Sequence, residues 1–137
     1  MRAVVDVNVL TSVALSARGP SAEILRNSRD GAFELVVSEL LIAELTRALA
    51  YRKLRKRIPA EKAAAFVSWA RDHGTLGEDP PEPPPVRSPD PDDDYLLALA
   101  IRRRAFLVTG DQHLLGLRAD LPILTPAEFE TKLREND

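Results

Sequence analysis

Short apolar runs alternate with amphipathic helical patterns along this chain. Runs rich in valine, leucine, isoleucine and phenylalanine predict strands at residues 2–6, 33–37, 105–109 and 122–124. Apolar positions that recur every three or four residues predict helices at 9–17, 21–30, 39–53, 59–73, 93–103 and 126–134, with a short additional helix around 114–115. Strands that alternate with helices indicate an α/β fold, in which helices cover both faces of a parallel sheet.

One long stretch between the predicted helices contains no such pattern. Seven of the eleven prolines lie between Pro80 and Pro91, a density that excludes both a helix and a central strand. We therefore expect an extended internal loop at residues 78–92. If this segment were a linker, a fold of about 45 residues would remain after it, which is close to the lower limit for a domain with its own core. The expectation is a single domain over residues 1–137.

Composition excludes several kinds of chemistry. The chain has no cysteine and two histidines, so it has no disulfide or thiolate zinc site, and a metal ion would need mostly oxygen ligands. The formal net charge of −2 gives no overall basic field, although a local basic patch is compatible with it. The apolar runs are shorter than the ~20 residues of a membrane span, and Asp6 interrupts the region where a signal peptide is apolar. We expect a soluble, cytoplasmic protein with no membrane partner.

Two acidic residues follow predicted strands. Asp6 ends the first strand, and Asp111 follows the third strand after Gly110. Ligands of open parallel sheets bind outside the carboxyl ends of the strands, so both carboxylates point toward one crevice. A single aspartate at a strand end is more often a loop residue or a helix cap. The presence of two such residues weakens that interpretation.

Helical wheels place further carboxylates beside apolar faces. Glu44 lies at the edge of the apolar face of the helix at 39–53, and Asp93 is in line with the apolar residues of the helix at 93–103, with Asp94 nearer its edge. A carboxylate beside a core is costly unless it is protonated, paired or bound to a cation. The alternatives are that Glu44 reaches the rim or pairs with a nearby arginine, and that Asp93 or Asp94 caps its helix.

Acids gathered from four separate segments would repel one another unless they were protonated or neutralised by a cation. A site of oxygen ligands with few histidines favours Mg²⁺ or Mn²⁺. Phosphodiester hydrolysis suits such a site, because the cations activate a water and stabilise both the attacking and the leaving oxygen. A phosphatase with Asp6 as nucleophile is less favoured, since it would need a second acid where this chain has Asn8.

Five segments resemble the PIN-domain nucleases, in particular the VapC-like toxins of bacterial and archaeal toxin–antitoxin pairs. They are VVDVNVL at 4–10, VSELLIAEL at 37–45, DPDDD at 90–94, LVTGD at 107–111 and ILTPAEF at 123–129. Their order and spacing cover nearly the whole chain. The resemblance implies a three-layer α/β/α PIN fold whose central parallel sheet has four to five strands. It also implies a metal-dependent endoribonuclease that acts on RNA, is inhibited by a cognate antitoxin protein and forms a homodimer.

By the family pattern, the catalytic and metal-binding acids are Asp6, Glu44, Asp93 and Asp111. Asp94 is the alternative to Asp93, because the run of three aspartates lets the alignment shift by one. The implied cofactor is Mg²⁺ or Mn²⁺. Asn8 and Thr109 occupy positions that support the metal ligands through hydrogen bonds. The chain departs from the family at 102–104, where three arginines replace a small, glycine-containing turn.

A run of cations after Glu44 offers a surface for RNA. It consists of Arg47, Arg52, Lys53, Arg55, Lys56 and Arg57, and residues 102–104 form a second cluster. The alternative is an ordinary solvated helix end. The apolar helices on either side of Pro59 could supply the contact of a homodimer. The competing functional interpretation is a PIN-like module that binds RNA or protein and has an inactive or weak metal site.

Overall fold

The computed structural model describes residues 1–16 and 18–135. In chain order its elements are β1 (Arg2–Val5), α1 (Val7–Leu15), α2 (Pro20–Arg29), β2 (Glu34–Val37), α3 (Glu39–Leu49), α4 (Arg52–Arg55), α5 (Ala60–His73), β3 (Thr75–Leu76), the 3₁₀ turn η1 (Pro91–Asp93), α6 (Asp94–Arg103), β4 (Phe106–Val108), α7 (Gln112–Leu115), β5 (Ile123–Leu124) and α8 (Pro126–Glu135). Residue 17, at which the first predicted helix ends, lies outside the described residues.

The five strands form one sheet in the order β3-β2-β1-β4-β5, and every neighbouring pair is parallel. This confirms the predicted α/β fold with a central parallel sheet. All the strands end at the same edge of the sheet, and β1 and β4 lie side by side in its centre. Residues that follow these two strands are therefore neighbours in space, although more than a hundred positions separate them in sequence.

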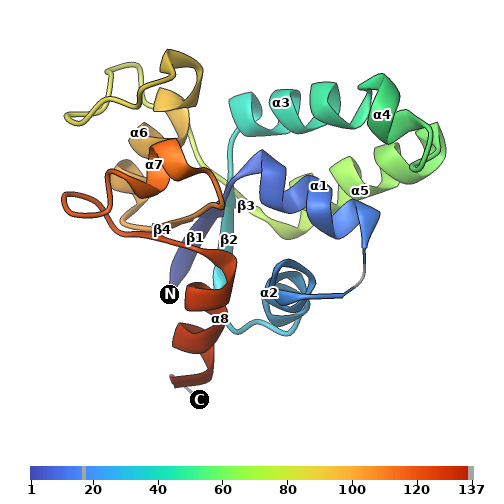
Figure 1. Cartoon of the computed structure of the whole chain (residues 1–137), viewed down its shortest axis with the longest axis horizontal. Helices are drawn as coiled ribbons and strands as arrows, with labels where there is room; N and C mark the ends of the chain where they lie inside the picture. The colour runs from blue at the N-terminus through green and yellow to red at the C-terminus, as the bar shows by residue number, and fades with distance from the viewer. Residues whose placement is uncertain (17, 136–137) are drawn as a thin grey trace.

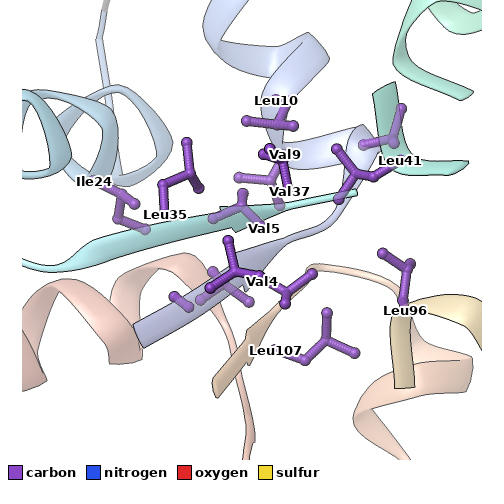
Figure 2. Close-up of a cluster of buried hydrophobic side chains, with 14 of the residues drawn as sticks. Val4, Val5, Val9, Leu10, Ile24, Leu35, Val37, Leu41, Leu96 and Leu107 are labelled. Carbon is purple, nitrogen blue, oxygen red and sulfur yellow. The ribbon is translucent and has the colours of Figure 1, made fainter. Parts of the chain in front are cut away.

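Helices cover both faces of the sheet (Figure 1), with α1 packed against α2 and α3 on one side and α6 packed against β1 and β4 on the other. Figure 2 shows Val5 on the side that faces Leu10 and Leu41, whereas Leu107 lies on the side of Leu96. The last three residues of β1 have 0% exposure. A strand that is buried on both faces consists of a continuous run of apolar residues, and this run made β1 predictable from the sequence.

Two features of the polypeptide differ from the predicted elements. The sheet contains a strand that was not predicted, β3, which pairs with Val36 and Val37. It has two residues, neither of them buried, so it leaves no apolar run in the sequence. The helix predicted over 39–53 is divided into α3 and α4, because Tyr51 adopts an extended backbone with φ −59° and ψ 141°. The turn directs the chain back so that Ile58 is buried.

The arginines at 102–104 preserve a tight turn before β4. Arg104 has φ 53° and ψ 48°, and it is the one non-glycine residue with positive φ in the described part of the chain. The backbone N–H of Ala105 donates to the carbonyl of Ala100 at 2.9 Å, and the N–H of Arg104 donates to Ile101 at 3.2 Å. These bonds form the helix end at which glycine is usual. The chain thus makes a glycine-type turn with an arginine.

The proline-rich segment runs as an irregular connection between β3 and η1, in agreement with the predicted loop except that η1 begins at Pro91. The buried apolar cluster includes residues that precede this segment, such as Leu41, and residues that follow it, such as Leu96. Within 1–16 and 18–135, no helix is both long and apolar enough to cross a membrane.

Candidate active site

Four acidic residues from four segments converge on the carboxyl edge of the sheet. Asp6 follows β1, Asp111 caps the N-terminus of α7 after β4, and Glu44 lies in α3. Asp93 is the last residue of η1 and the N-cap residue of α6. Burial raises the pKa of Asp93 to about 6, with further contributions from the negative charges of Asp6, Asp90, Asp111 and Glu44. The four predicted residues therefore lie close enough to influence one another's ionisation.

Asp6 is held at the centre of this acid group, which we define as Asp6, Glu44, Asp93 and Asp111. It is 5% exposed, and its Oδ2 accepts a hydrogen bond of 2.7 Å from the hydroxyl of Thr109. The same hydroxyl accepts a bond of 3.0 Å from the backbone N–H of Asp111. Burial raises the pKa of Asp6, while the Thr109 bond opposes that shift. Thr109 thus links the two acids that follow β1 and β4.

Asp93 and Asp94 point to different surroundings. One Asp94 oxygen accepts a bond of 2.7 Å from the backbone N–H of Ser88, and the other pairs with Arg87 at 3.3 Å. Both carboxylate oxygens of Asp94 are therefore occupied by contacts with the proline-rich segment. No such bond to the Asp93 carboxylate is found among the described residues, and its pKa responds to the other acids. The arrangement favours Asp93 over Asp94 as the member of the acid group.

Glu44 is half-buried, and it lines a cleft of about 600 Å³ together with Asn8, Arg47 and Tyr95. No ion pair to Glu44 is present in the described structure, so the alternative of pairing with a nearby arginine is not realised. The Tyr95 hydroxyl is buried and makes no hydrogen bond of ordinary geometry to a described atom. Burial and the neighbouring Glu44 carboxylate raise the pKa of Tyr95.

Asn8 lies beside Asp6 but supports it differently from the prediction. The Asn8 backbone lowers the pKa of Asp6, whereas no hydrogen bond from the Asn8 side chain to a described residue is present. The Asn8 side chain is exposed at the cleft. The Asn8 backbone carbonyl oxygen, by contrast, accepts bonds from the hydroxyls of Thr11 and Ser12 at 3.0 Å, and these bonds leave the side chain unoccupied. It is therefore free to meet a ligand that enters the cleft.

The donor set of the acid group fits a hard cation, although the side chains do not enclose one. No three acidic or histidine side chains in the described residues are close enough together to hold a metal ion. All four candidate ligands are carboxylates, the donors preferred by Mg²⁺ and Mn²⁺. None of the ion pairs described includes Asp6, Glu44 or Asp93, so the repulsion among these acids has no cationic side chain to relieve it.

The predicted RNA-binding cations lie on one exposed surface next to this cleft. Arg47, Arg52, Lys53, Arg55, Lys56 and Arg57 are all exposed. Among them, Arg47 lines the cleft itself. Two cleft residues that sequence reasoning missed are Tyr51 and Tyr95. Helical spacing does not identify Tyr51, because this residue lies beyond the end of α3 at Leu49.

Comparison with known proteins agrees with this architecture. The family model described as the PIN domain matches residues 2–113. No curated protein matches the chain. A chain of the crystal structure of VapBC2 from Rickettsia felis, bound to a DNA fragment from its promoter, has a TM-score of 0.63 at 12% identity and covers 91% of this chain and 98% of that chain.

The crystal structure of PAE2754 from Pyrobaculum aerophilum also has a TM-score of 0.63, at 18% identity, and covers 98% of this chain and 99% of that one. Identities this low support the fold alone. The family match has a broader consequence, because it spans most of the chain and takes in the segments that carry Asp6, Glu44, Asp93 and Asp111. The chain belongs to the PIN domain family.

Proposed function

We propose that this PIN domain is a Mg²⁺- or Mn²⁺-dependent endoribonuclease that hydrolyses RNA phosphodiester bonds. The observation that carries the proposal is the acid group at the carboxyl edge of the sheet. Its central member, Asp6, is 5% exposed, and Asp6, Glu44 and Asp93 have no cationic side-chain partner in the described structure. Buried carboxylates without a counter-charge are unfavourable in a structural role, whereas a cation bound among them would relieve their repulsion.

In this proposal Asp6, Glu44, Asp93 and Asp111 hold the metal. A bound divalent cation supplies an activated water and stabilises the charge that develops on the phosphate. Thr109 orients Asp6 through the 2.7 Å bond and positions Asp111 through its backbone. Asn8 presents its amide to the substrate at the cleft. Arg47 and the cations of residues 52–57 supply positive charge for the RNA phosphates.

The proposal extends to the biological setting. The five sequence segments that resemble VapC-like toxins, and the structural likeness to a VapBC2 chain over 91% of this chain, support a role as the toxin of a toxin–antitoxin pair. The partners are then an RNA substrate and a cognate antitoxin protein, and the same resemblance supports a homodimer. A second candidate is a PIN-like binding module with a weak site. It is favoured because no closed metal cage is found among residues 1–16 and 18–135.

Cleavage of a labelled mixed RNA by the purified protein tests the proposal. We expect cleavage with Mg²⁺ or Mn²⁺, none with EDTA, and a loss of at least about a hundredfold in Asp6→Asn and Asp111→Asn, because each removes a ligand charge. Asp120→Asn is the matched control, since Asp120 is an exposed acid outside the acid group. Absence of metal-dependent cleavage by the folded wild type, or full activity in Asp6→Asn, would favour the binding module.

A further inference from the structure

An exposed aromatic ring stands in the cleft beside the acid group. Tyr51 is 66% exposed, the highest value among the large hydrophobic side chains of the described residues. It lines the cleft of about 600 Å³ together with Glu44, Arg47 and Asn8. The structure gives this ring no aromatic or hydrogen-bonding partner within 1–16 and 18–135. Such a ring is available to a ligand that enters the cleft.

Tyr51 lines the cleft just beyond the end of α3. Glu44 and Arg47 are three positions apart and form a row along one face of α3. Leu40, which is 50% exposed, extends this row at its start. Tyr51 stands where α3 has ended and the backbone is extended, and it lines the same cleft as the row.

Charge along this row changes sign over one helical turn. Arg47 lies between the acidic Glu44 and the aromatic Tyr51, and no acidic side chain pairs with it in the described structure. Seven other arginines of the chain are paired with carboxylates, among them Arg2, Arg71 and Arg118. The cation in the cleft is thus left for a ligand. A cation next to an exposed ring is the arrangement that binds a phosphate and its attached base.

The cleft lining also includes residues of η1 and of the first turn of α6, namely Pro91, Asp92 and Tyr95. Asp92 and Glu44 are acidic and repel phosphate, whereas Arg47 attracts it. A phosphate in the cleft is therefore drawn to Arg47, and Tyr51, which lines the same cleft, offers its ring to a base.

We propose that Arg47 and Tyr51 form a nucleotide subsite next to the acid group, in which Arg47 binds a phosphate and Tyr51 stacks on an unpaired base. This subsite rests on the proposed nuclease function and defines its substrate class. Stacking on a side chain requires a base whose face is free, and this is the case in single-stranded RNA, loops and bulges but not inside a duplex. The cleft therefore selects RNA that is unpaired at the site of cleavage.

Binding of fluorescent RNA in EDTA, where cleavage is suppressed, tests the subsite. The probes are an eight-nucleotide single strand of mixed sequence and a duplex that contains it. We expect Tyr51→Ala to weaken single-strand binding about tenfold and Tyr51→Phe to retain it within about twofold, because stacking uses the ring and not the hydroxyl. Arg47→Ala should weaken binding and reduce its salt dependence by about one phosphate contact. Leu76→Ala, at a 50% exposed position in β3, is the matched control.

Photocrosslinking gives an independent readout of the stacked base. A single strand that carries 5-iodouridine should crosslink to the peptide that contains Tyr51, and the crosslink should be lost in Tyr51→Ala. The subsite is overturned if Tyr51→Ala binds the single strand as tightly as wild type, if the duplex binds equally well, or if the wild type binds no single strand.

Different experimental results would contradict the subsite and the nuclease function. Metal-dependent cleavage with unchanged binding by Tyr51→Ala would overturn the subsite alone. Single-strand binding that depends on Tyr51, without cleavage in Mg²⁺ or Mn²⁺, would overturn the nuclease function and leave the subsite in place.

Discussion

Individual carboxylates determine how this site responds to pH. Burial and the neighbouring negative charges raise the pKa of Asp93 to about 6. A folded-state pKa above the unfolded value means that ionisation of Asp93 opposes folding. Its unfavourable contribution is absent below the unfolded pKa of about 3.8, grows as the pH rises toward 6 and stays constant above that. The metal-free protein therefore carries this cost at neutral pH.

We predict that Asp93→Asn stabilises the metal-free protein at pH 7.5. The shift of about two pKa units corresponds to an upper limit of about 3 kcal/mol, and solvent screening at this partly exposed side chain reduces the expected gain to about 1 kcal/mol. Thermal unfolding in EDTA between pH 4 and pH 8 measures it, with the difference from wild type vanishing near pH 4. Asp92→Asn, at an exposed neighbour, serves as the control. A lower unfolding temperature for Asp93→Asn at pH 7.5 would contradict the prediction.

At the scale of elements, the end of α6 carries local backbone strain. Arg104 occupies the left-handed conformation with φ 53°, which costs a residue with a side chain about 1 kcal/mol relative to glycine. The two backbone hydrogen bonds of the turn, from Arg104 and Ala105, do not depend on the side chain. Hence the sequence can vary here while the helix end is retained.

We predict that Arg104→Gly raises the free energy of unfolding by about 0.5–1 kcal/mol. Urea denaturation in EDTA measures this change. Arg102→Gly is the matched control: Arg102 is also an exposed arginine but lies within the right-handed part of α6, so glycine there should destabilise by a similar amount. If both substitutions changed the free energy of unfolding by the same amount and in the same direction, the left-handed conformation of Arg104 would not be a source of strain.

At the scale of the whole molecule, the acid group connects metal binding to stability. Its members come from four segments spread between the end of β1 and the start of α7, so the fold must be complete before they meet. A cation that binds among them would stabilise the folded state but not the unfolded state, because only the folded state brings these acids together. At a concentration one hundred times the dissociation constant, this linkage is worth about 2.7 kcal/mol.

We predict that Mn²⁺ or Mg²⁺ raises the unfolding temperature of the wild type and that Asp6→Asn and Asp111→Asn reduce or abolish the rise. Thermal unfolding over a metal titration measures this effect without reference to activity. Asp120→Asn should respond as the wild type does. An unfolding temperature that is insensitive to metal, or a rise that is equal in all variants, would contradict metal binding by the acid group.

Local sequence patterns were enough to predict the main strands and the acids that follow them. Val4 and Val5 belong to a run buried on both faces, so their apolar character identified the strand without knowledge of its neighbours. Asp6 and Asp111 follow parallel strands, and the geometry of a parallel sheet brings such residues to one edge. These features depend on local pattern and on a general rule of topology, and both can be read along the chain.

The remaining features follow from contacts that form when the chain folds. The short strand β3 exists because Thr75 and Leu76 meet the edge of β2, and one oxygen of Asp94 is held by the backbone N–H of Ser88 in the proline-rich segment. Tyr51 lines the cleft because the chain bends after α3. Each outcome depends on the path of the backbone or on a contact with an irregular or edge segment, and neither leaves a periodic pattern of apolar residues. The direction of a polar side chain is therefore set by the contacts it finds after folding.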